Sequence, residues 1–265
     1  MFSFSKIFLA TSLDEAYSEL IKNKNNVVLG GTSYLRMGNN NWNVAIDLSN
    51  LNLNYILEEE STVKIGCMTT FRDMEKSPLL KKYFGNIFNL ALRDIIGVQF
   101  RSNVTAGATV FSKYGFSDLI PVLLTLNSKV SLVNGGEIPL EDFLNETSIR
   151  KDILKEIIIP KTELITSFQC VRKSKTDYSI LNMAIAMDNT NKNITISVGA
   201  RPGKAILAKS TMEILNSSIN EDNLIKAMKN ICNEIPVDSN MRGSKNYREL
   251  LLAALLRKGI QEVLL

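Results

Sequence analysis

The stretch that decides the fold is 27-VVLGGTSYL-35, a short apolar run that leads into two glycines and two hydroxyl-bearing residues. Gly30 and Gly31 carry no Cβ, so the backbone there can approach a ligand closely. Consecutive N–H groups beside the hydroxyls of Thr32 and Ser33 suit an anion such as a pyrophosphate. The stretch is neither a GxGxxG fingerprint nor a P-loop. On its own it is more typical of a tight turn between a strand and a helix.

The residues around this stretch predict a small α/β lobe. Residues 3–9, 27–29 and 44–48 are apolar enough to form strands. Residues 13–22 predict a helix, because apolar residues line one face and Ser12 can cap the first turn. The order strand, helix, strand favours parallel pairing.

From residue 53 the pattern changes to hairpins and short helices. One hairpin is expected from residues 55–57 and 63–66, and a second from residues 129–133 and 137–140 across the turn Asn134-Gly135-Gly136. Short helices are expected at residues 71–75, from Pro78, at 86–92 and at 121–126. Residues 97–111 contain turn-forming and small residues. A strand at 156–159 stops at Pro160, and we place a domain boundary near residue 162.

The remaining residues predict a second domain of strands and helices. Residues 167–172 and 195–199 indicate strands, whereas residues 178–187 fit either a strand or a helix by their period. Two helices are expected between residues 208 and 231, and an amphipathic helix at 247–263.

The composition excludes several classes of catalytic site. The chain has 265 residues, 45% of them hydrophobic, and no histidine. Without an imidazole there is no Ser-His-Asp triad, no Cys-His pair and no histidine metal site. Cys67, Cys170 and Cys232 lie far apart and form no CxxC pair, which argues against zinc ribbons and Cys₄ iron–sulfur clusters within this chain. No catalytic side chain and no metal ligand are expected, so any redox chemistry needs a borrowed reactive group.

Charge and hydropathy predict a cytoplasmic chain with neither nucleic acid nor membrane as partner. The formal net charge is only +4 and the basic residues are scattered. The one short basic run, Arg172, Lys173 and Lys175, is best interpreted as a solvated face, although it could meet a nucleotide or an iron–sulfur partner. No apolar run approaches the ~18–20 residues of a membrane span. The first residues show no signal peptide, and reduced thiols are expected.

A second candidate site is 101-RSNVTAGATVFSKYGFSDL-119, where small residues cluster between Thr105 and Thr109 and an aspartate follows at Asp118. Such a run admits close backbone contact, and the carboxylate could accept from the hydroxyl of a ribose or ribityl group. Alone, the run equally fits a loop packed tightly on a neighbouring helix.

With both runs, residues 27–35 and 101–119, the chain resembles the FAD-binding subunits of the molybdenum hydroxylases. This family includes xanthine dehydrogenase and the medium subunit of carbon monoxide dehydrogenase. The family pattern A-G-G-T-D/S-L is similar to residues 29–34, and Q-x-R-N-x-x-T-x-G-G-N is similar to residues 99–109. The family's S-D-L-x-P-x-L matches residues 117–123. Further landmarks follow in order: Ile65-Gly66, Ser77-Pro78-Leu79-Leu80, Pro139 to Phe143, Ile157 to Pro160, Met241 to Ser244, and Tyr247-Arg248.

The resemblance implies an α+β fold of two domains. Residues 1–162 would form an FAD-binding domain of the vanillyl-alcohol-oxidase type, with α/β lobes at about 1–52 and 53–162. Residues 163–265 would form a C-terminal α+β domain with a three-stranded antiparallel sheet and helices.

The resemblance also implies a site. Two glycine-rich loops would cradle the FAD diphosphate and adjoining ribityl through backbone N–H groups, Asp118 would contact sugar hydroxyls, and Ile95 and Leu154 would lie near the ring systems. The loops consist of Leu29, Gly30, Gly31, Thr32, Ser33 and Tyr34, and of Thr105, Ala106, Gly107, Ala108 and Thr109. Two residues depart from the family pattern, because Ala108 and Thr109 stand where it has Gly-Asn. An alanine at a position with positive φ would cost about 1 kcal/mol and weaken FAD binding.

The implied function is electron transfer within a multi-subunit oxidoreductase. A [2Fe–2S] subunit would supply electrons, FAD would carry them, and NAD or another acceptor would take them, while a molybdopterin subunit oxidises the substrate. The flavin would be non-covalent, because a histidyl tether is impossible and a cysteinyl link is the lesser alternative. The alternatives are an assembly or scaffold subunit of the same fold that has lost FAD, and a stand-alone FAD oxidoreductase.

Overall fold

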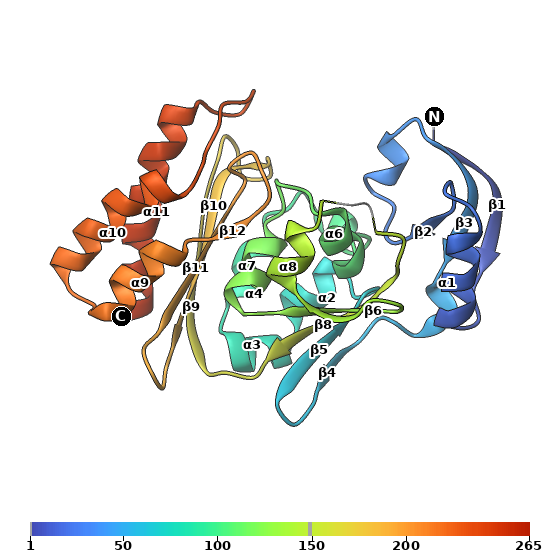
Figure 1. The fold of residues 1–265 in the computed structure, drawn as a ribbon, viewed down its shortest axis with the longest axis horizontal. Helices are drawn as coiled ribbons and strands as arrows, with labels where there is room; N and C mark the ends of the chain where they lie inside the picture. The colour runs from blue at the N-terminus through green and yellow to red at the C-terminus, as the bar shows by residue number, and fades with distance from the viewer. Residues whose placement is uncertain (1, 148–149) are drawn as a thin grey trace. The chain divides into compact units, whose positions relative to one another are not determined.

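A computed structural model describes residues 2–147 and 150–265 (Figure 1). Contacts divide the chain into two compact units. The first comprises Met1–Met74, Val98–Ser112 and Ser128–Ile159, and the second comprises Glu75–Gly97, Lys113–Asn127 and Pro160–Leu265. Two short segments that precede residue 160 therefore belong to the second unit.

The first unit begins with the predicted α/β lobe. β1 (Ser3–Leu9), β3 (Asn41–Asp47) and β2 (Val27–Leu29) form a parallel sheet in the order β1-β3-β2. α1 (Leu13–Lys22) makes the crossover that parallel strands require. Its N-cap is Ser12, whose Oγ accepts a 3.1 Å hydrogen bond from the Glu15 N–H. The expected strands, helix, cap and parallel pairing are confirmed.

The rest of the first unit consists of a five-stranded sheet, in the order β4-β5-β8-β6-β7, and several short helices. Both expected hairpins are present as antiparallel pairs, β4 with β5 and β6 with β7. The strands are β4 (Ile56–Glu58), β5 (Thr62–Gly66), β6 (Lys129–Leu132), β7 (Gly136–Pro139) and β8 (Leu154–Pro160). The short helical elements are η1 (Leu35–Met37), η2 (Ser49–Leu51), α2 (Phe71–Lys76), α5 (Val98–Arg101), α6 (Ala106–Ser112) and α8 (Leu140–Asn145).

The stretch 97–111 differs from its expectation, because it contains two short helices rather than a loop. α6 starts at Ala106, and an antiparallel bridge joins Thr105 to Thr70 just before it. Ala108 lies inside α6 and is absent from the residues with positive φ. The expected strain at Ala108 was therefore wrong, since alanine is the best helix former and fits here without cost.

The second unit is built on an antiparallel sheet in the order β12-β11-β10-β9. The three expected long strands are β9 (Leu164–Arg172), β10 (Ser179–Asp188) and β11 (Ile194–Gly199), and the two-residue β12 (Ile206–Leu207) extends the sheet to four. Residues 178–187, whose period fits either a strand or a helix, form the strand β10. The strand is buried along nearly its whole length, so it shows no alternation of apolar and polar residues.

Helices cover both faces of this sheet, which explains the burial of β10. α7 packs on one face, and α11 with α9 and α10 lies on the other (Figure 1). The helices of the unit are α3 (Pro78–Phe84), α4 (Ile87–Leu92), α7 (Leu119–Thr125), α9 (Lys209–Ser217), α10 (Glu221–Glu234) and α11 (Lys245–Leu264). The apolar core between the sheet and α9–α11 includes Leu181, Met183, Ile196, Leu215, Ile231 and Leu256.

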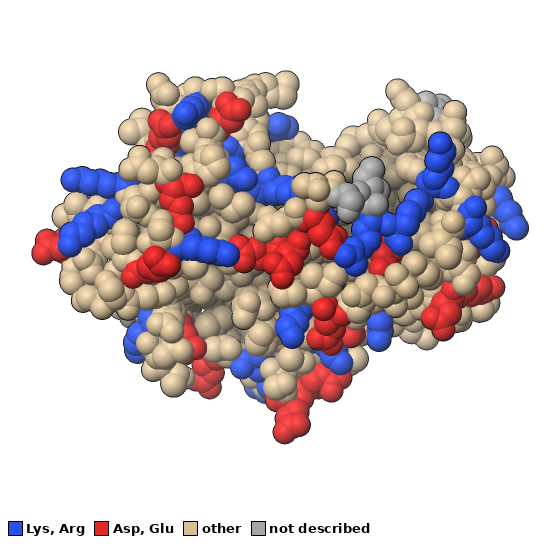
Figure 2. Space-filling model, viewed as in Figure 1, with Lys and Arg blue, Asp and Glu red and all other residues tan. Residues whose placement is uncertain are grey.

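The charges on the face shown in Figure 2 alternate in sign, and lysines and arginines are interspersed with acidic residues. Among the described residues, no helix combines the length and the apolar character needed to cross a bilayer.

Candidate cofactor-binding site

The first loop (residues 30–34) follows directly from β2 and carries an unusual backbone. Thr32 has a φ of 55°, in the left-handed region that β-branched residues rarely enter. Such a conformation costs about 1–3 kcal/mol and is typical of ligand clamps. In the described part of the chain, the amide N–H groups of Gly31, Thr32 and Ser33 find no acceptor. The loop therefore presents successive free donors, as anion-binding turns do.

The two glycines allow this loop to contact the Thr105 segment (residues 105–109). A Cβ built on Gly30 would lie 2.6 Å from the Ala108 Cβ and 2.8 Å from the Thr105 Oγ1. A Cβ built on Gly31 would lie 1.6 Å from the carbonyl oxygen of Asn103. Only glycine fits at such separations, so the two sequence motifs meet in one place.

The Thr105 segment has fewer free backbone donors than the resemblance implies, because several of its donors already bind within the first unit. The Ala106 N–H donates to the Thr69 carbonyl, and the Gly107 N–H donates to the Cys67 carbonyl, both at 2.9 Å. The Thr109 hydroxyl donates to the Thr105 carbonyl at 2.9 Å, one turn back along α6. These three donors are thus engaged within the first unit.

The Thr105 hydroxyl is the free side-chain donor of this segment. Its oxygen is buried and has no hydrogen-bond partner, and the residue is only 4% exposed. A buried hydroxyl without a partner costs about 1–3 kcal/mol. Because the hydroxyl lies beside Gly30, which directly precedes the free amides of the first loop, these residues fit an anionic diphosphate.

The packing behind α6 places a thiol near the site but leaves it inert. A Cβ on Gly107 would lie 2.5 Å from the Cys67 Cβ, so glycine lets α6 approach the end of β5. Burial raises the pKa of the Cys67 thiol to about 12. The nearby Tyr55 hydroxyl donates to Glu156 at 2.6 Å, and burial followed by this contact raises the pKa of Tyr55. Cys67 is thus a free and buried cysteine.

The remaining predicted residues are distributed over both units. Leu29 ends β2 just before the first loop, Tyr34 is the last residue of that loop, and Leu154 is the buried first residue of β8 in the first unit. Ile95 and Asp118 belong to the second unit, where Ile95 is half-buried beside Ile96, a second β-branched residue with positive φ.

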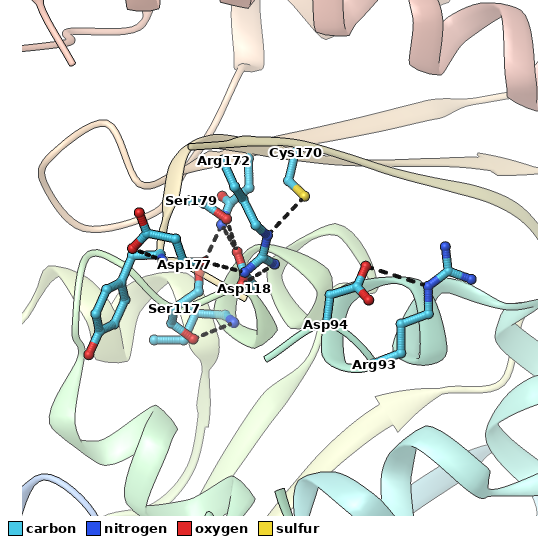
Figure 3. A network of polar contacts seen from close by, with 11 residues as sticks. Arg93, Asp94, Ser117, Asp118, Cys170, Arg172, Asp177 and Ser179 are labelled. Atoms are coloured by element: carbon cyan, nitrogen blue, oxygen red, sulfur yellow. Dashed lines mark hydrogen bonds and ion pairs between the residues drawn. The ribbon is translucent and has the colours of Figure 1, made fainter. Parts of the chain in front are cut away.

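Asp118 lies at the centre of a buried polar network in the second unit (Figure 3). Its Oδ2 accepts from Arg172 Nη2 at 2.7 Å. Its Oδ1 accepts from Ser179 Oγ at 2.6 Å and from Asn182 Nδ2 at 2.5 Å. A carboxylate has about four acceptor positions, so three of them are filled by the protein and one is left for a ligand hydroxyl.

The interpretation of Arg172 as part of a solvated face was wrong. Its side chain is 8% exposed, and its guanidinium also donates to the Asp177 carbonyl at 2.8 Å and to the Cys170 Sγ at 3.4 Å. Desolvation lowers the pKa of Arg172, but Asp118 and Cys170 more than offset this effect and the net shift is upward. Sequence reasoning missed this pair because its members are separated by 54 positions along the chain.

Nearly the whole chain is similar in sequence to known protein families and to individual relatives. Residues 2–162 match the family described as "FAD binding domain in molybdopterin dehydrogenase", and residues 166–263 match "CO dehydrogenase flavoprotein C-terminal domain". The glyceraldehyde dehydrogenase medium chain of Sulfolobus acidocaldarius is 26% identical over 271 residues, covering 96% of each chain. The nicotinate dehydrogenase FAD-subunit of Eubacterium barkeri is 26% identical over 190 residues, covering 64% of each chain.

Solved structures share the fold. A Cu,Mo-CO dehydrogenase chain superimposes with a TM-score of 0.89 at 19% identity, covering 98% of this chain and 97% of that one. A chain of quinoline 2-oxidoreductase from Pseudomonas putida 86 gives a TM-score of 0.87 at 19% identity, covering 98% and 96%. The expected fold class and family resemblance are both confirmed. This chain belongs to the family of FAD-binding subunits of the molybdenum hydroxylases, and its cofactor is FAD.

Proposed function

We propose that this chain is the electron-transfer subunit of a molybdenum hydroxylase that receives electrons from a [2Fe–2S] subunit and passes them through FAD to NAD or another acceptor. The observation that carries the proposal is the meeting of the first loop with the Thr105 hydroxyl, since both leave hydrogen-bond donors unused. FAD, when bound, supplies the redox chemistry, and the protein supplies its position and electrostatic surroundings.

The proposed cradle consists of the first loop and the Thr105 segment, and its hydrogen-bond donors would bind the negatively charged diphosphate. The amides of Gly31, Thr32 and Ser33 and the hydroxyl of Thr105 would donate to the phosphate oxygens, because hydrogen bonds to an ionised acceptor are the strong ones. Ala106, Gly107, Ala108 and Thr109 would support the cradle by their packing. Contacts to the flavin or adenine rings are proposed for the remaining apolar residues: Leu29, Tyr34, Ile95 and Leu154.

Asp118 has a proposed double role. Its ion pair with Arg172 holds the carboxylate in place, and its one remaining acceptor position suits a sugar hydroxyl of the cofactor.

The proposed attachment of FAD is non-covalent. The chain has no histidine to form a tether. Cys67 is the cysteine that packs against the Thr105 segment, and a thiol with a pKa of about 12 is almost entirely protonated at neutral pH and is a poor nucleophile. Acid precipitation should therefore release all flavin into the supernatant.

The proposed partners are an iron–sulfur subunit and a molybdopterin subunit. Two relatives carry the names "medium chain" and "FAD-subunit", which describe parts of larger assemblies. The three scattered cysteines of this chain do not suit an iron–sulfur cluster, so that cluster is assigned to a separate chain.

Two measurements on the purified protein test the proposal. Titration of the flavin-free chain with FAD should saturate at one FAD per chain, with the absorption of a bound flavin. A colourless protein that ignores added FAD would instead support the scaffold alternative. In the reconstituted complex, addition of substrate should bleach the flavin, and addition of NAD should restore its colour. A flavin that substrate never reduces would contradict the proposed electron path.

A further inference from the structure

Asn103 connects the two halves of the proposed cradle through its side chain. Its Nδ2 donates to the carbonyl oxygen of Gly31 and, at 3.3 Å, to the Ser33 Oγ. Both acceptors belong to the first loop, more than 65 positions away along the chain. The Ser33 hydroxyl in turn donates to the Gly31 carbonyl at 3.4 Å, so two side chains donate to one peptide oxygen.

This contact determines the direction of a backbone donor. A trans peptide is planar, and its C=O and N–H point in opposite directions. When the Gly31 carbonyl is held toward Asn103, the Thr32 N–H of the same peptide must face away from Asn103. That N–H is one of the free donors of the first loop.

The orientation in which Asn103 holds the Gly31–Thr32 peptide is also the one that strains the backbone of Thr32. Rotation of the Gly31–Thr32 peptide changes ψ of Gly31 and φ of Thr32. Because a β-branched residue disfavours the observed φ of 55°, the loop has an intrinsic tendency to turn this peptide over. Gly31 lacks a Cβ and offers little resistance to such a rotation.

We infer that Asn103 is a positioning residue that latches the Gly31–Thr32 peptide with its N–H toward the FAD diphosphate. The inference rests on the proposed role of the first loop. Asn103 acts through Gly31 and Ser33, and it would not itself contact the cofactor.

The chemistry of the latch requires an amide. Aspartate has the same shape but donates no hydrogen bond when ionised, and it would place a negative charge beside the Gly31 carbonyl and the diphosphate. Alanine simply removes the latch. Asn103 is exposed, so neither substitution opens a cavity in the core.

The test is equilibrium titration of flavin-free protein with FAD, followed by flavin fluorescence. We expect Asn103→Ala to weaken FAD binding by about tenfold, the size of one or two lost hydrogen bonds, and Asn103→Asp to weaken it further. Ser102→Ala is the matched control, because that neighbouring hydroxyl is exposed and donates only to the Val98 carbonyl at 2.9 Å. Thermal unfolding of the flavin-free variants checks that each remains folded.

A double-mutant cycle distinguishes a latch from a general structural role. Glycine at position 32 adopts positive φ without strain, so the peptide no longer tends to turn over. Asn103→Ala should then cost less FAD affinity in the Thr32→Gly background than in the wild type, whereas a residue of merely structural importance would give additive effects.

The outcomes separate the two proposals. Equal FAD affinity for Asn103→Ala, Ser102→Ala and wild type, or strict additivity in the cycle, overturns the latch while the cradle stands. If Gly31→Ala leaves the FAD affinity of the wild type unchanged, the cradle itself is misplaced, and the latch falls with it.

Discussion

At the scale of single residues, the first loop depends on the absence of side chains at two positions. The carbonyl of Asn103 occupies the place that a Cβ on Gly31 would need. Backbone cannot give way as a flexible side chain can, so the loop must move if Gly31 is replaced. The free donors of Gly31, Thr32 and Ser33 would move with it.

We therefore expect Gly31→Ala to abolish measurable FAD binding and to lower the free energy of unfolding by about 1–3 kcal/mol, the usual cost of overpacking. Gly38→Ala is the matched control, because a Cβ there would meet only the Leu35 carbonyl at 3.5 Å. Calorimetric titration with FAD and chemical unfolding measure the two effects. Similar results for both variants would contradict the proposed close approach.

A second residue-scale prediction concerns the Cys67 thiol. Its pKa rises from 9.0 to about 12 on folding, so the folded state holds its proton while the unfolded state loses it. The resulting stability is fully present below pH 9 and is lost as the pH rises toward 12, by up to about 1.4 kcal/mol per pH unit. Urea unfolding between pH 8 and 11 should show a shallower decline for Cys67→Ala than for the wild type. Identical slopes would mean that the thiol titrates normally.

At the scale of elements, the Asp118 network joins the start of α7 to β9 and β10. Arg172 ends β9, and Ser179 and Asn182 belong to β10. Because both members of the ion pair are buried, removal of one leaves the other charge without a partner, at a cost of about 3–5 kcal/mol.

Arg172→Met should thus lower the thermal unfolding midpoint strongly. Lys175→Met is its control, because the Lys175 side chain is 82% exposed and its 3.7 Å pair with Asp94 should be worth less than about 1 kcal/mol. Equal midpoints for the two variants would show that the Asp118 network does not hold these elements together.

Local patterns predicted most elements correctly, and the failures share one cause. Ser12 capped its helix and the turn at residues 134–136 joined its hairpin, because both signals act over a few residues. The start of α6 was missed, since it depends on the bridge from Thr105 to Thr70 and on Gly107 packing against Cys67. Asn103 was missed for the same reason, as its partners lie in the other lobe.

The sequence indicated which two segments are candidates for the site, but not which of their hydrogen-bond donors are free. The motifs at residues 29–34 and 105–109 lie against each other, whereas their small residues alone indicated only a close approach to a ligand. Only coordinates could show that the Ala106 and Gly107 amides are already engaged while the Thr105 hydroxyl is free.

At the scale of the whole molecule, the two compact units do not divide at residue 162 as proposed. Segments that precede residue 160 belong to the second unit. α7 belongs to the second unit, every one of its residues is buried, and it packs on β10 and β11. A fragment of residues 1–162 contains α7 without those strands. We expect this fragment to expose apolar surface, to bind a hydrophobic dye and to unfold without a cooperative transition, unlike the full chain. A monomeric fragment that melts cooperatively would contradict the assignment of α7.

The central claim is that the free Thr105 hydroxyl belongs to the FAD site, and Thr105→Val tests it with two effects of opposite sign. Valine keeps the shape and removes an unpartnered buried hydroxyl, so it should stabilise the flavin-free protein. Ser128→Ala is the control, because Ser128 is also a buried hydroxyl without a partner but lies outside the proposed cradle.

The most direct measurement is the FAD dissociation constant of these two variants beside the wild type. We expect Thr105→Val to weaken FAD binding by about tenfold, the value of a hydrogen bond to a charged group, and Ser128→Ala to leave it unchanged. An unchanged dissociation constant for Thr105→Val would contradict the account.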